Sequence, residues 1–336
     1  MRIAITRMRR VGSLWLLLTA SVAANPLVER VGDITITVSD LEQSITFYRD
    51  VLEFQLDARA ELSGEPYDHL TGLTSTRMLS ARMTLGNEAI ELLEFVSPRG
   101  RPVPPESRSN DQWFQHVAII VSDMERAYRQ LRQRGVQHVS PGPQRLPDWN
   151  AAAGGIEAFY FRDPDSNTLE VLRFPEGKGD PRWQVGGRLF LGIDHTAIVV
   201  ADTERALTLY RDMLGLQIAG RSENYGPEQE RLNSVFAARL RITALRARHG
   251  PGIELLEYLA PPGGRMAPAD TRPNDLWHWH TALLMVGDDW LSSIQDSSLT
   301  WLSTQSVILR HGRRAQLARD SDGHGLLLYR DPGAGE

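Results

Sequence analysis

The chain has 336 residues, contains no cysteine and carries a formal net charge of −5 at pH 7. Its length suffices for two domains of ordinary size. The lack of cysteine excludes disulfides, thiolate metal sites and a cysteine nucleophile. Because nucleic-acid binding requires a basic face, we do not expect this acidic chain to bind nucleic acid.

Residues 1–24 have the pattern of a secretory signal peptide. Four arginines precede a largely apolar stretch of 14 residues, "VGSLWLLLTASVAA", whose small residues suit cleavage after Ala23 or Ala24. This stretch is short for a bilayer-spanning helix. An uncleaved anchor or a misplaced start codon is the alternative. We therefore expect an exported protein, periplasmic or secreted, that is free of the membrane after cleavage. Cleavage would remove four arginines and no acid, which moves the formal charge from −5 to −9.

The rest of the chain contains one long pattern twice. The segment "DITITVSDLEQSITFYRDVLEF" corresponds to "DHTAIVVADTERALTLYRDMLGL", and "AIELLEFVSP" corresponds to "GIELLEYLAP", with offsets of 162 to 164 residues between landmarks. Self-similarity at a fixed spacing indicates duplicated structural units. The sequence therefore predicts two domains, residues 26–180 and residues 181–336.

Each half contains a weaker repeat of its own. Ser39 with Glu42, and Ser122 with Glu125, match the capping box that begins a helix, and Gly135 is placed to end one. Each predicted helix follows a short apolar strand and precedes alternating segments, such as "RMLSARMTL" and "GIEAFYFRD", which predict further strands. The unit is one strand, one helix and about three strands. We number its four copies modules 1 to 4 and expect an α+β fold.

Each module places one polar residue at the same point of its first strand. These residues are Asp33, His116, His195 and His280. The last strand of three modules carries an acid at a matching point: Glu91, Glu170 and Glu254, whereas Leu327 stands in the fourth. Because alternate residues of a strand face opposite sides, we expect each set on one face.

These histidines and acids suggest a metal site. A carboxylate among apolar strands is costly to bury unless it is paired, hydrogen-bonded or bound to a metal. Any single one of them could instead be a solvent-facing glutamate or a capping histidine, but their repetition in register favours metal binding. Neutral imidazoles and carboxylates suit one divalent ion of Fe, Mn, Ni, Co or Zn.

The repeated motifs resemble the vicinal oxygen chelate superfamily, which includes glyoxalase I, bleomycin-resistance proteins, methylmalonyl-CoA epimerase and type I extradiol dioxygenases. The similarity lies in "DHTAIVVADTERALTLYRDMLGL", "FYRDVLEF", "IELLE" and "FRDPDSNTLEVL" and covers nearly all of the chain after residue 24. The resemblance implies βαβββ modules that pair into glyoxalase-like domains with open, cupped barrels. It also implies that a divalent metal is held by the first and last strands of two paired modules.

The partner of each module determines the ligand set. Sequential pairing, which we favour, gives Asp33, Glu91, His116 and Glu170 in the first domain, and His195, Glu254 and His280 beside Leu327 in the second. Asp33 is shorter than the usual histidine, which puts the geometry of the first set in doubt. Pairing of modules 2 and 3 gives His116, Glu170, His195 and Glu254, the full two-histidine, two-glutamate set of glyoxalase-like enzymes. Asp33, Glu91, His280 and Leu327 would then form a degraded second site.

The linkers before modules 2 and 4 share the phrase "ND.W..H", and each has an arginine fifteen residues before its histidine. We expect Trp113 and Trp277 to plug the barrels and the Asn-Asp pairs to cap turns. Arg101 and Arg265 could belong to this framework or bind an anion. His249, His311 and His324 have no repeat partner at a ligand position and are expected at the surface.

Three functions remain open. The first is a glyoxalase-like isomerase or lyase that acts on an unidentified small oxygenated molecule, in which a metal stabilises an enediolate and Glu170 or Glu254 moves the proton. Export argues against glutathione-dependent glyoxalase I itself, because that thiol is cytosolic. The second is an extradiol-type dioxygenase with Fe(II) at His195, His280 and Glu254. The third is a metal-free small-molecule binding protein of the bleomycin-resistance type. A monomer and a homodimer both fit.

Overall fold

The computed structural model describes residues 27–333 except Gly263 and Asp296. The expected signal peptide therefore lies outside the described residues. Within the described part of the chain, no helix combines the length and apolar character that crossing a membrane requires.

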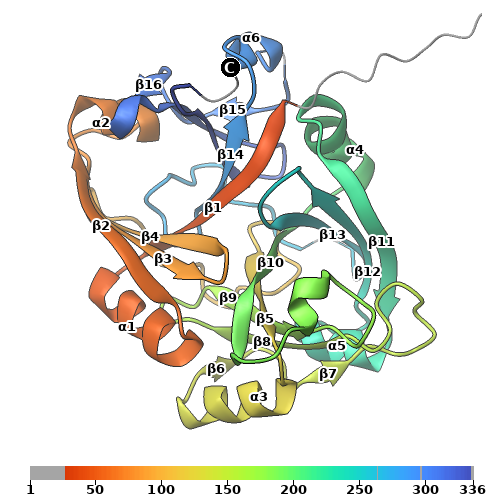
Figure 1. Ribbon diagram of the computed structural model, residues 1–336. Coiled ribbons are helices and arrows are strands. Elements are labelled where there is room, and N and C mark those ends of the chain that lie inside the picture. Colours follow the sequence, from red (N-terminus) through yellow and green to blue (C-terminus); the bar gives the residue numbers. More distant parts are fainter. Residues whose placement is uncertain (1–26, 263, 296, 334–336) are drawn as a thin grey trace, which may run out of the picture.

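Two nine-stranded sheets form the body of the molecule (Figure 1). Sheet A has the order β15-β17-β18-β14-β1-β4-β3-β2, with β16 beside β17. Its strands are β1 (Val28–Val38), β2 (Gln55–Ser63), β3 (Arg77–Leu85), β4 (Glu88–Ser97), β14 (Trp279–Met285), β15 (Thr300–Trp301), β16 (Val307–Ile308), β17 (Arg314–Arg319) and β18 (Gly325–Arg330).

Sheet B has the order β11-β12-β13-β10-β5-β9-β8-β6, with β7 beside β8. Its strands are β5 (Gln115–Val121), β6 (Gln137–His138), β7 (Gln144–Arg145), β8 (Glu157–Arg162), β9 (Thr168–Arg173), β10 (Phe190–Val199), β11 (Gln217–Tyr225), β12 (Arg239–Arg246) and β13 (Gly252–Ala260). Both sheets are open, so the predicted α+β fold with cupped sheets is confirmed.

The modules do not pair in sequence order. Strand β1 of module 1 pairs antiparallel with β14 of module 4, and β10 of module 3 pairs antiparallel with β5 of module 2. Sequential pairing is therefore wrong, and the alternative is correct. The boundary near residue 180 separates two sequence repeats, whereas each sheet takes strands from both halves. The four first strands are similarly apolar, so the repeat alone does not identify their partners.

The two helices with predicted capping boxes, α1 and α3, are capped by aspartates rather than by the predicted serines. Asp40 caps α1 by accepting from the backbone N–H of Gln43, and Asp123 caps α3 by accepting from that of Arg126, each over 2.9 Å. Ser122 instead donates to a carbonyl of a neighbouring loop. Gly135 follows α3 with φ of 70°, as expected for a helix end. The α-helices are α1 (Leu41–Leu52), α2 (Glu65–Thr71), α3 (Met124–Gln133), α4 (Thr203–Leu207), α5 (Pro227–Asn233) and α6 (Trp290–Ser293).

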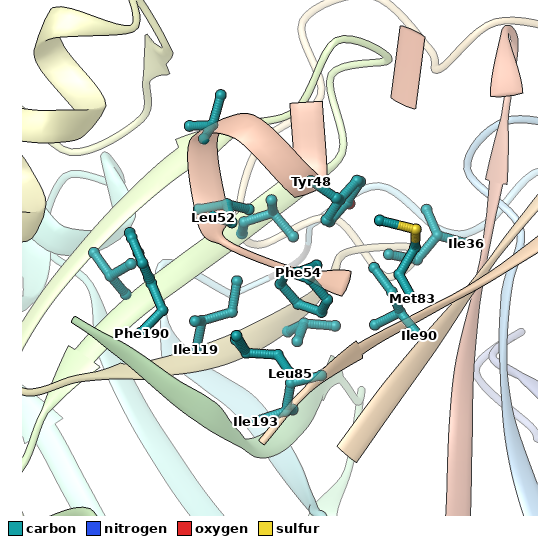
Figure 2. Packing of buried hydrophobic residues seen from close by; sticks show 14 of the residues in the cluster. Ile36, Tyr48, Leu52, Phe54, Met83, Leu85, Ile90, Ile119, Phe190 and Ile193 are labelled. Atoms are coloured by element: carbon teal, nitrogen blue, oxygen red, sulfur yellow. The ribbon is translucent and has the colours of Figure 1, made fainter. Parts of the chain in front are cut away.

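Apolar side chains of both sheets pack together in a shared core. Ile36 and Met83 of sheet A contribute to the same cluster as Ile119 and Ile193 of sheet B, with α1 lying over them (Figure 2). A second cluster joins the sheets on the side of α4 and α6. Since these cores bury side chains from all four modules, the two sheets stabilise each other.

Two buried tyrosines connect consecutive modules. The hydroxyl of Tyr48 in α1 donates to Asp163 of module 2 over 3.2 Å, and that of Tyr210 donates to Asp320 of module 4 over 2.8 Å. These contacts join the repeated "YRD" motif to the repeated "RD.D" motif, which accounts structurally for both.

The histidines outside the repeat differ in burial. His249 and His311 are exposed, as predicted. The surface prediction for His324 is wrong, because this residue is 5% exposed and its Nε2 lies 2.7 Å from the carbonyl oxygen of Val199. This contact connects the two sheets and explains why His324 is buried.

Candidate metal centre

Four polar side chains meet on the four central strands of sheet B. Ala197 of β10 pairs with His116 of β5 on one side and with Glu254 of β13 on the other. Ala118 of β5 pairs in the same way with His195 of β10 and Glu170 of β9. All four side chains therefore share one face of the sheet, and the two small alanines leave space between them.

Three of these side chains come within bonding reach of a common ion. His116, Glu170 and His195 each offer one ligand atom, and these atoms lie within 4.8 Å of one another. His116 Nε2 is 3.1 Å from Glu170 Oε2, and His195 Nε2 is 3.8 Å from the same oxygen. Glu254 Oε2 stands 3.4 Å from His195 Nε2. Two imidazoles and a carboxylate form a donor set suited to first-row transition metals and zinc.

The buried ring of His116 is not satisfied by hydrogen bonds. The residue is 1% exposed, and neither ring nitrogen has a hydrogen-bond partner among the described residues. Its contact with Glu170 lacks hydrogen-bond geometry. A buried polar atom without a partner costs about 1–3 kcal/mol, and a cation near Nε2 would remove part of this cost. The residues present therefore fit a divalent metal ion.

His195 is oriented by its neighbour Asp194. The Nδ1 atom of His195 lies 2.9 Å from Asp194 Oδ2, which also accepts from Arg246 Nη2 over 2.8 Å. Trp183 donates its indole N–H to Asp194 Oδ1 over 3.0 Å. A hydrogen bond to the outer ring nitrogen fixes the tautomer that presents Nε2 to a metal. Asp194, Arg246 and Trp183 are thus a supporting layer behind the ligand.

The electrostatics of the group favour positive charge. Burial opposes the imidazolium form of His195, but Glu254, Asp194 and Glu170 outweigh this and raise its pKa to about 9. Burial also raises the pKa of Asp194, yet His195 and Arg246 hold it well below its usual range. The site therefore stabilises a cation, whether that is a proton or a metal ion.

A large cavity opens over the four residues. Its volume is about 630 Å³, and its walls come from β11, β12, α5 and the loop before β8. Tyr160 lies against His116 with ring centroids 4.9 Å apart, and burial together with Glu170 raises the pKa of the tyrosine well above its usual value. Glu254 is 23% exposed and Glu170 is 5% exposed. Of the two acids, Glu254 is therefore the more accessible from the cavity.

The other predicted ligands lie in sheet A. Asp33 is bound by Arg82, whose Nε donates to its carboxylate over 2.6 Å. Glu91 accepts from Ser80 and from Thr35. His280 lies on β14 of sheet A, whereas His195 and Glu254 lie in sheet B. The predicted oxygenase triad of His195, His280 and Glu254 is therefore wrong. Among the described residues, only the sheet B group brings three possible ligands together.

The repeated linkers form a structural clasp. Arg101 binds Asp275 and lies over Trp277, and Arg265 binds Asp111 and lies over Trp113. Each aspartate also caps its own turn by accepting a backbone N–H three residues before it. Of the two alternatives left open for these arginines, the contacts support a place in the linker framework.

Sequence reasoning missed the supporting layer of Asp194, Arg246 and Trp183. Asp194 directly precedes a predicted ligand, but the other three modules have glycine, glutamine or tryptophan there. Trp183 lies 11 residues before Asp194 and Arg246 lies 52 residues after it, and neither belongs to a repeated motif. Only the acid beside His195 could have served as a signal.

The family model for the Glyoxalase/Bleomycin resistance protein/Dioxygenase superfamily matches residues 30–171 and 192–292. A 2-epi-5-epi-valiolone epimerase from Actinomyces sp is 30% identical over 148 residues, which cover 42% of this chain and 77% of that protein. Glyoxalase I from Saccharomyces cerevisiae is 24% identical over 143 residues, which cover 40% of this chain and 39% of that protein.

Solved structures of this superfamily share the fold. Glyoxalase I from Zea mays superposes with a TM-score of 0.60 at 15% identity and covers 90% of this chain and 92% of its own. A putative dioxygenase from Bacillus subtilis superposes with a TM-score of 0.57 at 16% identity and covers 92% of this chain and 87% of its own. These structures show the shared fold, and the family-model match across both halves shows that the chain belongs to the Glyoxalase/Bleomycin resistance protein/Dioxygenase superfamily.

Proposed function

We propose that this protein is a divalent-metal-dependent enzyme of glyoxalase-like type, an isomerase or lyase that acts on a small oxygenated molecule. The metal would be held by His116, Glu170 and His195, with Glu254 as the fourth ligand or as the base. The observation that carries the proposal is the buried imidazole of His116, which has no hydrogen-bond partner among the described residues and lies beside Glu170 and a second histidine.

The residues of the site have distinct tasks in this proposal. A divalent ion supplies Lewis acidity toward oxygen atoms of a bound molecule. Glu170 is enclosed between the two histidines and is the more suitable carboxylate ligand. Glu254 is more accessible, so its Oε2 is placed to accept a proton from a carbon next to a carbonyl group and to return it. Asp194 holds the His195 ring in position.

The cavity supports a small-molecule substrate. A volume of about 630 Å³ lies within the range of roughly 300–1,000 Å³ that is usual for ligand sites. Apolar residues such as Leu146, Leu232 and Leu240 line it beside the polar group. A compact molecule with two neighbouring oxygen atoms would place its polar end on the sheet and its apolar part against these walls.

Metal analysis of purified variants tests the ligand set. His116 and His280 occupy the same point of modules 2 and 4, so His116→Ala and His280→Ala form a matched pair. We expect about one divalent ion per chain in the wild type and in His280→Ala, and loss of the ion in His116→Ala. A wild type that binds no metal on purification or reconstitution overturns the proposal and leaves a metal-free binding protein.

Proton exchange tests the chemistry. Acetoin is a small hydroxyketone, and exchange of its carbon-bound proton in D₂O can be followed by NMR. We expect faster exchange with the metal-loaded protein and slower exchange with Glu254→Gln, provided that metal content is retained. A metal-loaded wild type without activity on any member of a hydroxyketone panel contradicts the proposed reaction class.

A second candidate function is that of a dioxygenase. Two histidines and one carboxylate are also the ligand set of non-haem Fe(II) oxygenases, and His116, His195 and Glu170 now supply it. Oxygen consumption by the Fe(II)-loaded protein with catechol, lost in His116→Ala, would favour this function over the first.

We further propose that the protein acts after export. The basic, then apolar, then small-residue pattern of residues 1–24 supports this. Mass spectrometry of the protein from cell fractions of its native source should find an N-terminus near Asn25 outside the cytoplasm. A cytoplasmic protein that retains Met1 or the following residues contradicts export.

A further inference from the structure

Sheet A contains a second cavity that lies apart from the candidate metal centre. It has a volume of about 260 Å³ and none of its lining residues belongs to the sheet B group. The lining is mostly apolar: Leu62, Met78, Leu93, Phe95, Leu317 and Leu327. Cavities of about 150 Å³ with such linings bind benzene, so this space is large enough for one substituted ring.

The floor of this cavity is the counterpart of the metal centre. Thr35 of β1 pairs with His280 of β14 on one side and with Glu91 of β4 on the other. Ala197 stands between His116 and Glu254 in the same way in sheet B. In sheet A, however, Leu327 replaces the fourth ligand and Arg82 binds Asp33. Only Glu91 and His280 remain as polar groups of the floor, which is too few for the family's metal site.

His280 has an unfulfilled capacity for hydrogen bonding. Its residue is 9% exposed, its Nδ1 is buried, and its side chain makes no hydrogen bond with the described residues. Burial lowers its pKa to about 4, so the ring is neutral at pH 7. A neutral imidazole can donate at one nitrogen and accept at the other.

Glu91 is better satisfied than His280 but has acceptor capacity left. Ser80 Oγ donates to Oε1 over 2.6 Å, and Thr35 Oγ1 donates to Oε2 over 3.3 Å. A carboxylate accepts about four hydrogen bonds. Glu91 and His280 together can therefore bind a hydroxyl group that both donates and accepts.

The charges around the cavity select against an ionic ligand. Arg310 and Arg313 lie among its lining residues, and the ion pair with Asp331 neutralises Arg313. The remaining positive charge disfavours an ammonium ligand, while Glu91 at the floor disfavours a carboxylate that enters fully. An uncharged molecule avoids both conflicts.

We propose that the sheet A cavity is a metal-free binding site for a small, uncharged and mostly apolar molecule with one hydroxyl group, of the phenol class. The ring lies among the leucines, Met78 and Phe95, and the hydroxyl group meets His280 and Glu91. This site is additional to the proposed metal enzyme and does not depend on its activity.

Binding of four ring compounds tests the proposal. Phenol, toluene, benzoate and benzylammonium share a ring and differ in the group that reaches the floor. Ligand-observed NMR with the full-length protein should show phenol bound at least tenfold more tightly than the other three compounds. Equal binding of phenol and toluene, tighter binding of benzoate or benzylammonium, or no binding of phenol overturns the proposal.

Variants assign the binding to one of the two cavities. His280→Phe removes the imidazole, and Leu327→Trp fills the cavity from another strand, so one of them remains informative if the other fails to fold. Each folded variant should lose phenol binding at least tenfold, whereas His116→Ala in sheet B should keep it. Loss of phenol binding in His116→Ala, with retention in the sheet A variants, would place the phenol in the first cavity and refute the assignment.

Discussion

Arg101 and Asp275 form an ion pair across 174 positions of the sequence, with Nη2 and Oδ2 separated by 2.7 Å. The backbone N–H of Arg101 also donates to this carboxylate over 3.0 Å. Arg265 and Asp111 repeat both contacts at 2.7 Å and 3.0 Å. The linkers of the two halves thus hold each other, and each supplies the arginine that the other requires.

Substitution of Asp275 should weaken this clasp. The aspartate side chain is 2% exposed and accepts from two backbone groups and from Arg101. Asp275→Asn places an amide donor against these donors, so we expect a loss of about 2 kcal/mol in the free energy of unfolding. Urea denaturation followed by circular dichroism measures it. Asp50→Asn is the control, because Asp50 pairs with Arg49 at the exposed surface and should show no measurable loss.

Close packing of the same linkers requires glycine at position 100. A Cβ atom on Gly100 would lie 1.7 Å from the carbonyl oxygen of Asn274, and one on Gly264 would lie 1.5 Å from that of Asn110. Because these neighbours are backbone atoms, Gly100→Ala should destabilise the protein by about 3 kcal/mol or more. The same denaturation assay applies. Gly220→Ala, where no atom lies within 4 Å, should be tolerated, and equal stabilities of the two variants would contradict the close contact.

Asp194 should tune metal affinity without contacting the metal. Asp194→Asn removes the charge that orients His195, and such changes typically weaken metal binding by about 10–100-fold. Competition with a chromophoric chelator measures the dissociation constant. Glu91→Gln changes an acid of sheet A and should leave affinity unaltered. Equal affinities of wild type and Asp194→Asn would show that the charge of Asp194 does not contribute to metal binding through His195.

Acid should unfold the protein partly through His280. Burial lowers its pKa to about 4 in the folded state, whereas the unfolded value is about 6.5. Below pH 6.5 the unfolded chain therefore binds a proton that the folded chain does not bind, so stability falls as the pH falls toward 4. Over this pH range, we expect the free energy of unfolding to fall by about 3 kcal/mol less in His280→Phe than in the wild type. His278 shares the trend, because burial, Arg319 and His280 lower its pKa too.

Denaturation midpoints across this pH range provide the measurement. His249→Gln is the control, because His249 is exposed and should leave the slope unchanged. A slope that is the same in His280→Phe and in the wild type would show that His280 does not contribute to the acid sensitivity.

The repeat in the sequence predicted the four modules and the strand positions of the candidate ligands. This succeeded because a period of two along a strand and a constant offset between copies are local properties. His116, Glu170, His195 and Glu254 were all identified in this way. The choice between the two ligand sets required the module pairing, which depends on contacts between residues such as Ile34 and Thr281. No residue pattern within β1 or within β14 predicts that contact.

The sequence also did not predict the charge partners of the acidic residues. Asp33 occupies a ligand position by alignment, but Arg82 from another strand binds it. Asp194 was overlooked because the other modules do not repeat it. Both outcomes depend on which side chains the fold brings together, and a pattern of residue types does not contain that information.

Because the pairing is crossed, the strands of sheet B form one continuous stretch of the sequence, and the strands of sheet A come before and after that stretch. The strands of sheet B lie between residues 115 and 260, whereas those of sheet A occupy residues 28–97 and 279–330. During synthesis, sheet B, which carries the candidate metal centre, can therefore form first. Strand β1 can pair with β14 only after nearly the whole chain has been synthesised. Until then, the apolar edge of β1 that faces β14 is exposed. Such long-range pairing is slow and prone to aggregation, so a chain cut short near residue 270 would retain a complete sheet B beside a β1 that pairs with β4 but lacks β14 at its other edge.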